Sequence, residues 1–238
     1  MGLLEDALSA AGGLDRWREL RRFTAYLSIK GELLARTRKA GMLSEVVAEG
    51  STRVQSLRLT GFVAPNKRGT YRPDRVAIEN LDGSLLQERN NPRAAFLDRA
   101  DRASWDDLDL TYFFGFSLWN YLTAPFLLAF PGVETEELPI WRQQGETWRR
   151  LKVIIPPSVA THSREQTFYF DDSGLQRRMD YHAIDAQGVQ IAHYSSAHQK
   201  FSGIVVATLR RSMKLRPDGS VVQKPSSVDI EIFDASFE

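Results

Sequence analysis

An uncharged stretch of 24 residues, Leu110 to Val133, constrains the fold of this chain more than any other feature. It contains eight of the 25 aromatic residues and is long enough to cross a bilayer. Acidic residues flank both ends, no Lys or Arg anchors either end, and Pro125 interrupts the stretch, which is the wrong pattern for a membrane span. We therefore expect a helix enclosed on both sides, which either fills the core or covers a cavity.

Strands are predicted on both sides of this stretch. Alternation of apolar and polar residues from Phe23 to Leu33 predicts a long strand with one covered face. Further strands are predicted at about 43–49, 53–60 and 75–90, the last containing an Asp82-Gly83 hairpin turn, and at about 148–155, 166–171, 175–184, 189–197, 203–215 and 227–233. Short breaks with turn chemistry separate the later strands, so hairpins are favoured over crossover helices.

These elements predict an α+β fold in one domain, residues 1–238. Its main part is a large curved antiparallel sheet, a half-barrel of about ten strands, because a twisted sheet of that size curls. Two short N-terminal helices, joined at Gly12-Gly13, and a central helical insertion are expected to pack on its concave face.

Composition excludes some classes of protein. The net charge of +1 gives no global reason to bind nucleic acid, and the absence of cysteine excludes disulfides and thiolate metal sites. The first thirteen residues have no basic region and only a broken apolar run, so they do not read as a secretory signal. The sequence therefore predicts a cytoplasmic protein without a transmembrane span.

The four histidines are the main candidates for chemistry. No pair has the helical spacing of a zinc enzyme, so no metal site is expected, and satisfied structural histidines are favoured. His182 and His193 lie on strands joined by one turn, and a shared face would place them side by side. No nucleotide-binding or nucleophile motif is present, so catalytic residues and cofactors stay unknown.

Two strands carry basic runs, one at Arg149, Arg150 and Lys152 and the other at Arg210, Arg211, Lys214 and Arg216. A solvated sheet face is the simplest explanation. If both runs share a face, they could instead attract an anionic head group.

The second half of the chain resembles a family of uncharacterised bacterial proteins across most of residues 112–233. The resemblance rests on the segments YFFGFSLWNYLTAPFLL, GETWRRLKVIIPPSVATHSREQTFYFDDSGLQRRMDYH and AHYSSAHQKFSGIVVATLRR. The chain departs from that pattern at Met179, where a His is expected, and at Ala207, where a Pro is expected. The first departure argues against a catalytic histidine at that position.

The whole layout is similar to the lipoprotein-carrier fold of the LolA/LolB type. The shared features are an N-terminal helix containing Gly-Gly, long strands, a central helical insertion, and a late strand reading Phe-Tyr-Phe-Asp with Gly-Leu after it. The resemblance implies a half-barrel with helices covering an apolar cavity that binds a lipid or another hydrophobic ligand, in carriers that work in the periplasm. It is an analogy of fold.

The leading hypothesis is therefore a non-enzymatic protein that binds a hydrophobic or lipid-like small molecule between the sheet and the uncharged stretch. The predicted ligand-binding residues are Phe114, Trp119, Asn120, Phe126, Tyr169, Tyr181, His182 and His193. The alternative is an enzyme acting on a hydrophobic small molecule, with His182 and His193 as acid–base or metal groups. A third possibility is a scaffold that binds a partner through an exposed apolar patch.

Overall fold

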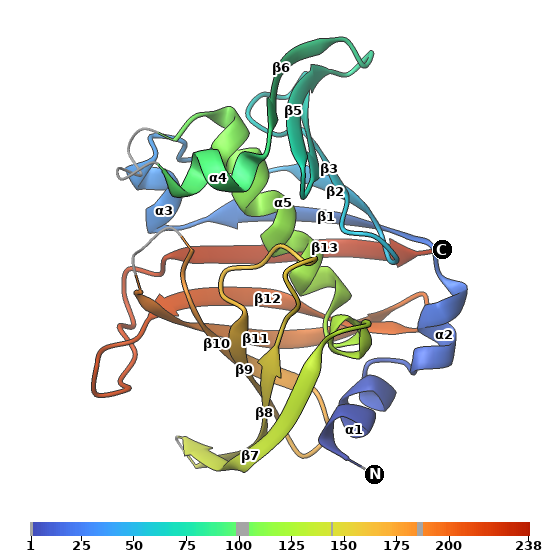
Figure 1. Cartoon of the computed structure of the whole chain (residues 1–238), viewed down its shortest axis with the longest axis vertical. Helices are drawn as coiled ribbons and strands as arrows, with labels where there is room; N and C mark the ends of the chain where they lie inside the picture. The colour runs from blue at the N-terminus through green and yellow to red at the C-terminus, as the bar shows by residue number, and fades with distance from the viewer. Residues whose placement is uncertain (1, 99–104, 144, 185–187) are drawn as a thin grey trace.

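One curved antiparallel sheet of thirteen strands makes up most of the molecule in the computed structural model, which describes residues 2–98, 105–143, 145–184 and 188–238 (Figure 1). The sheet does not close on itself, since β6 and β7 are its two edges. The strands are β1 Arg22–Lys30, β2 Val46–Ser51, β3 Leu57–Thr60, β4 Lys67–Arg72, β5 Arg75–Asn80, β6 Leu85–Asn90, β7 Glu134–Gln143, β8 Glu146–Ile154, β9 Glu165–Phe170, β10 Gln176–His182, β11 Gln190–Phe201, β12 Ile204–Lys214 and β13 Val228–Phe237. The helices are α1 Leu3–Ala10, α2 Leu14–Glu19, α3 Glu32–Arg36, α4 Pro92–Leu97, α5 Asp107–Thr123 and the 3-10 helix η2 Phe126–Ala129.

The strand order explains why a helix crosses the sheet. The sheet consists of two meanders: β1 to β6 run outward from its middle, and β7 to β13 return from the opposite edge until β13 pairs with β1. The chain must therefore pass from edge β6 to edge β7 over one face, and the central helical insertion makes that passage (Figure 1).

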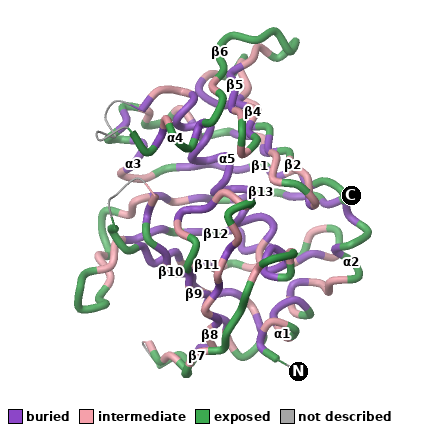
Figure 2. Tube along the Cα trace, viewed as in Figure 1, coloured by how far each residue is buried: buried purple, intermediate pink, exposed green. Residues whose placement is uncertain are grey.

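Helix α5 forms the main part of this passage. Asp106 begins it, because its carboxylate accepts a hydrogen bond from the Asp109 backbone N–H at 2.9 Å. Seventeen residues make a helix of about 25 Å, whereas thirteen flat strands would extend roughly 55–60 Å. Because the sheet is curved, α5 contacts β3, β4 and β5 on one side and reaches β10, β11 and β12 on the other. Every residue from Leu108 to Thr123 is buried, as predicted for the uncharged stretch (Figure 2).

The long strand predicted for residues 23–33 ends earlier, at Lys30. Phe23, Ala25, Leu27 and Ile29 are buried as the alternation predicts. Gly31 then adopts a φ of 124°, and a Cβ atom there would lie 2.6 Å from the Ser227 carbonyl oxygen. The close approach turns the chain into α3, so the last part of the predicted strand is helical.

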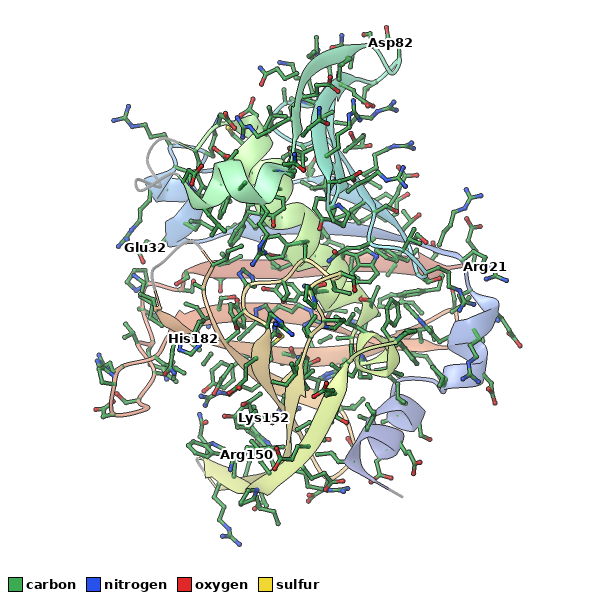
Figure 3. All side chains as sticks on the ribbon, in the orientation of Figure 1. Arg21, Glu32, Asp82, Arg150, Lys152 and His182 are labelled. Carbon is green, nitrogen blue, oxygen red and sulfur yellow. The ribbon has the colours of Figure 1, made fainter. Side chains whose placement is uncertain are left out.

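The sheet is also larger than the predicted ten strands, because β4 and β7 lack the expected pattern. The β4 sequence KRGTYR carries three basic residues and a glycine, and β7 carries three glutamates and Pro139. β7 is an edge strand, where charge and proline are common because they block pairing with another chain, whereas β4 pairs with a neighbour on both sides. The two N-terminal helices and the Asp82-Gly83 hairpin lie where they were predicted, with Asp82 at the tip of the hairpin (Figure 3). In the described part of the chain no helix is long and apolar enough to cross a membrane.

Candidate functional site

A cluster of polar side chains lies inside the apolar interior, between α5 and strands β10, β11 and β12. Ser117 and Tyr121 come from α5, His162 from the loop after β8, and Tyr181 from β10. The His162 Nε2 atom is 3.1 Å from the Ser117 hydroxyl and 3.2 Å from the Tyr121 hydroxyl. The Tyr121 and Tyr181 hydroxyls are 3.2 Å apart, and the His162 ring stacks on the Tyr181 ring at 4.3 Å. These contacts hold the middle of α5 against the late strands.

His193 extends the cluster on β11. Its Nδ1 atom is 2.8 Å from the Ser212 hydroxyl, and its ring centre is 4.3 Å from that of Tyr121. The Nε2 atom of His193 and the Nδ1 atom of His162 have no hydrogen-bond partner among the described residues. Buried polar atoms usually have a partner, so two unsatisfied imidazole nitrogens mark this interior as unusual.

Burial keeps these groups neutral. It lowers the pKa of His162 to about 3, and the positive charge of Arg93 adds to the effect. Burial and the charge of Arg210 also lower the pKa of His193 well below its ordinary value. Burial raises the pKa of the Tyr121 hydroxyl to about 12. At neutral pH both imidazoles are therefore uncharged, and each forms hydrogen bonds with neighbouring hydroxyl groups as a neutral ring.

Arg210 of β12 supplies the charge of this site. Its side chain is buried, with the residue 5% exposed. Nη2 donates to the Tyr121 carbonyl oxygen at 2.8 Å and Nη1 donates to the Ser195 hydroxyl at 3.2 Å. Burial lowers its pKa to about 10, so the guanidinium stays charged at neutral pH. No carboxylate pairs with it among the residues that the structure describes.

Most predicted ligand-binding residues are buried, but they do not converge on one place. Phe114, Trp119 and Phe126 are packed in the core, where the Trp119 Nε1 atom donates to the Ser51 carbonyl and the Phe126 ring stacks on Trp17 at 4.3 Å. Asn120 donates to the Ala160 carbonyl oxygen at 3.1 Å. Tyr181 and His193 belong to the polar cluster described above.

Tyr169 and His182 lie away from this interior. The Tyr169 hydroxyl donates to Asp180 at 2.7 Å, and its ring packs near Trp141 on the other face of the sheet. His182 is exposed (Figure 3). The predicted pairing of His182 with His193 is wrong, because His193 pairs with Met179 and His182 pairs with Gln190. That register places the two imidazoles on opposite faces of the sheet.

The basic run on β12 is likewise divided between the two faces. Even positions from Ile204 to Ser212 are buried, whereas Leu209 and Arg211 are exposed. Arg211 pairs with Asp229 at 2.8 Å, and Arg210 points inward. The parity of Ile204 and Val206 in the sequence already assigns Arg210 to the covered face, and this signal was not used.

Ser117, Tyr121 and His162 were also missed as a group. The first two occur at helical spacing in the uncharged stretch, but nothing in the sequence places His162 opposite them. In the described ranges no cluster of three or more His, Asp or Glu side chains could hold a metal ion.

The fold is of the LolA-like type. No protein-family profile matches the sequence, and no curated protein matches it. The likeness in fold is shown by solved structures that superpose over nearly the whole chain.

Three such structures are similar. A putative outer membrane lipoprotein-sorting protein domain from Vibrio parahaemolyticus has a TM-score of 0.54 at 10% identity, and covers 99% of this chain and 92% of its own. A DUF1329 family protein from Desulfovibrio piger has a TM-score of 0.51 at 12% identity, with the same two coverages of 99% and 92%. A LolA superfamily protein from Nitrosomonas europaea has a TM-score of 0.51 at 8% identity, and covers 98% of this chain and 93% of its own.

The predicted cytoplasmic location is wrong in the light of these neighbours. They include an outer membrane lipoprotein-sorting protein and a LolA superfamily protein, which point to a periplasmic or extracellular location. The prediction had relied on the absence of a signal in the first residues, and that absence carries no weight against the fold.

Proposed function

We propose that this protein is a non-enzymatic carrier that binds a hydrophobic or lipid-like small molecule between its curved sheet and α5, in the periplasm or outside the cell. The observation that carries the proposal is the arrangement of α5. Apart from two aspartates in its first turn, α5 is an uncharged helix that crosses an unclosed sheet and is buried along nearly its whole length, and the polar cluster holds it against the late strands. The LolA-like fold supports the proposal.

The side chains of the described residues nearly fill the space between the end of α5 and strands β10 to β12. The pocket beside the end of α5 has a volume of about 20 Å³, which holds about one water molecule, whereas small-molecule sites are typically about 300–1,000 Å³. Ligand uptake therefore requires α5 or α1 to move away from the sheet. Phe114, Trp119, Phe126 and Tyr181 would then form apolar walls, with Asn120 and His193 as polar groups.

The alternative of an enzyme is less well supported. It requires His182 and His193 to reach one substrate, and they lie on opposite faces of the sheet. His193 is buried against Ser212 and Tyr121, with no carboxylate to activate it within the described residues. We therefore retain the carrier.

Native mass spectrometry of the purified protein, followed by organic extraction, tests the proposal. We expect a co-purified apolar molecule, or uptake of a lipophilic fluorophore that added lipid displaces. A protein that arrives empty and binds neither the fluorophore nor any lipid would contradict the carrier function.

A further inference from the structure

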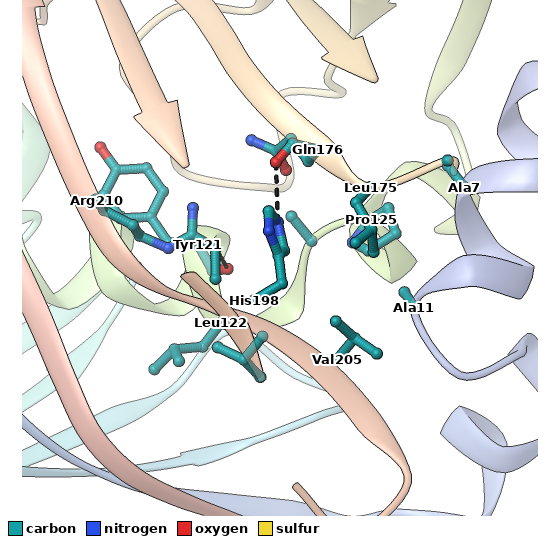
Figure 4. Close-up of a pocket in the computed structure, with 14 residues that line it drawn as sticks. Ala7, Ala11, Tyr121, Leu122, Pro125, Leu175, Gln176, His198, Val205 and Arg210 are labelled. Atoms are coloured by element: carbon teal, nitrogen blue, oxygen red, sulfur yellow. Dashed lines mark hydrogen bonds between the residues drawn. The ribbon is translucent and has the colours of Figure 1, made fainter. Parts of the chain in front are cut away.

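The pocket beside the end of α5, whose lining residues are drawn in Figure 4, contains buried hydrogen-bond donors that have no acceptor among the described residues. It is lined by α1, the last turn of α5, and strands β10 to β12. None of its lining residues is acidic; they are Ala7, Ala11, Tyr121, Leu122, Ala124, Pro125, Gly174, Leu175, Gln176, His198, Val205, Val206, Ala207 and Arg210.

Two buried donors in this lining are unsatisfied. The Nε atom of Arg210 and the amide Nε2 atom of Gln176 have no partner among the described residues. The contact with His198 does not involve this amide, because the His198 Nε2 atom donates to the backbone carbonyl oxygen of Gln176 at 3.0 Å. Leaving a buried donor unpaired costs about 1–3 kcal/mol, and more for a charged group. Both atoms therefore need an acceptor that the described residues do not supply.

A purely structural role for Arg210 explains only part of this arrangement. The Tyr121 carbonyl lies in the last turn of α5, where carbonyls lack helical partners and a cation is favourable. That contact gives the Nη2 atom an acceptor, and the Ser195 hydroxyl gives the Nη1 atom one. It leaves Nε unpaired and the positive charge without an anion.

We propose that this pocket binds the carboxylate or phosphate oxygens of an anionic amphiphile through Arg210 and Gln176. The oxygens of an anionic group are strong acceptors for such donors, and their negative charge offsets that of the guanidinium. The apolar side chains of Leu122, Pro125 and Val205 in the same lining suit the start of an acyl chain. The pocket volume of about 20 Å³ admits only the head-group oxygens, so the acyl chain of the ligand enters by displacing α1 or α5. The inference rests on the proposed carrier function and names its ligand class.

Calorimetric titration with dodecanoate and with dodecan-1-ol at pH 7.5 tests the proposal, because the two differ only in their head groups. We expect the wild-type protein to bind dodecanoate at least about tenfold more tightly than the alcohol, the size of one charge-assisted hydrogen bond. Dodecyl phosphate, acetate and inorganic phosphate, titrated in parallel, distinguish a lipid head group from a free anion.

The neighbouring arginines provide matched variants. Arg210→Met should reduce the ratio of the affinities for dodecanoate and dodecan-1-ol to about one. Arg211→Met should preserve it, because Arg211 is exposed on the other face and pairs with Asp229. Gln176→Glu keeps Arg210 in place, adds a carboxylate to the pocket, and should reduce the same ratio, so the test does not depend on the folding of one variant.

Each outcome of these titrations either supports the head-group site or overturns it. Equal binding of acid and alcohol by the wild type, or an undiminished ratio in Arg210→Met, would overturn the head-group site and leave the carrier intact. Arg210-dependent binding of acetate or phosphate as tight as that of dodecanoate would also overturn it, in favour of a plain anion site. Binding of no amphiphile at all would refute the carrier function together with this inference.

Discussion

Two buried neutral histidines, each hydrogen-bonded to hydroxyl groups, make the stability of the fold depend on pH. At neutral pH the imidazoles of His162 and His193 are uncharged in both the folded and unfolded chain, so they contribute nothing to a pH dependence there. The ordinary pKa of histidine is 6.5, and burial lowers the pKa of both imidazoles below it. Below pH 6.5 the unfolded chain therefore binds protons that these two imidazoles do not bind in the folded protein. The free energy of unfolding therefore falls as the pH falls.

We predict that this loss amounts to roughly 2 kcal/mol for His162 at about pH 5. His162→Asn should lose less stability between pH 7 and pH 5 than the wild type by about that amount, measured by urea unfolding at both pH values. His182→Gln is the control, because it replaces an exposed imidazole on the other face of the sheet. An equal loss in wild type and His162→Asn would contradict the prediction.

Single residues also show what the sequence could and could not reveal. Parity along β12 assigns Arg210 to the covered face and Arg211 to solvent, so that part of the site was predictable. The contact of His162 with Ser117 and Tyr121 was not predictable, because His162 lies 45 positions after Ser117 and 41 positions after Tyr121. The predicted ligand-binding residues as a set stay a prediction.

At the scale of elements, α5 lies unusually close to β4. Gly115 on α5 leaves no room for a side chain, since a Cβ atom would lie 2.3 Å from the Tyr71 Cγ atom. Tyr71 itself is 1% exposed. At Gly69 of β4 the contacts are looser, with the Phe62 ring and the Thr111 hydroxyl at 3.0 Å.

Gly115→Ala should therefore destabilise the protein by about 1–3 kcal/mol through overpacking. Helix propensity alone would give the opposite sign, a gain of about 1 kcal/mol, so the sign of the change identifies the close approach. Chemical denaturation measures it, with Gly69→Ala as a companion expected to cost less. A stabilised Gly115→Ala variant would mean that α5 packs less tightly on β4 than described.

The elements that the sequence missed have a common cause. β4 and β7 are strands because a neighbour pairs with them, and their own residues show no clear apolar alternation: the covered face of β4 consists of Gly69 and Tyr71. In β7 nearly every position is exposed, so no alternation could arise. The strand predicted to reach Leu33 ended early for a related reason, since the approach of Ser227 to Gly31 comes from a distant part of the chain.

At the scale of the whole molecule, α1 and the loop that follows it cover the pocket beside the end of α5. β12 and β13 pair over only four residues each, from Leu209 to Ser212 and from Val228 to Glu231. Next to this pairing the Val205 N–H donates to the Ala11 carbonyl oxygen at 2.9 Å. One hydrophobic cluster runs from Leu3 to Phe237, which favours one domain, although the extent of the domain stays a prediction.

If α1 must move for uptake, then locking it should block binding. The chain has no cysteine, so Ala11→Cys with Val205→Cys introduces one disulfide between residues already joined by a backbone hydrogen bond. We expect the oxidised double variant to lose uptake of a lipophilic fluorophore and to regain it on reduction. The control is Glu49→Cys with Arg58→Cys, an exposed cross-strand pair in β2 and β3 that leaves α1 free. Full uptake by the oxidised Ala11–Val205 variant would show that α1 is not the gate.

The sequence by itself determined the class of the fold, the enclosure of α5 and most of the strands. Periodicity, turn chemistry and the lack of charge from Leu110 to Val133 are local properties, and burial follows from them directly. Tertiary structure alone decided that α5 ends against Arg210, that His162 meets Tyr121, and that His182 and His193 face apart. Those outcomes depend on strand register and on the passage of the chain from β6 to β7 across the curved sheet, which bring distant residues together. The uncharged stretch is therefore an enclosed helix only as far as Thr123, where it borders the charged pocket, and its last residues form a 3-10 helix and an exposed turn.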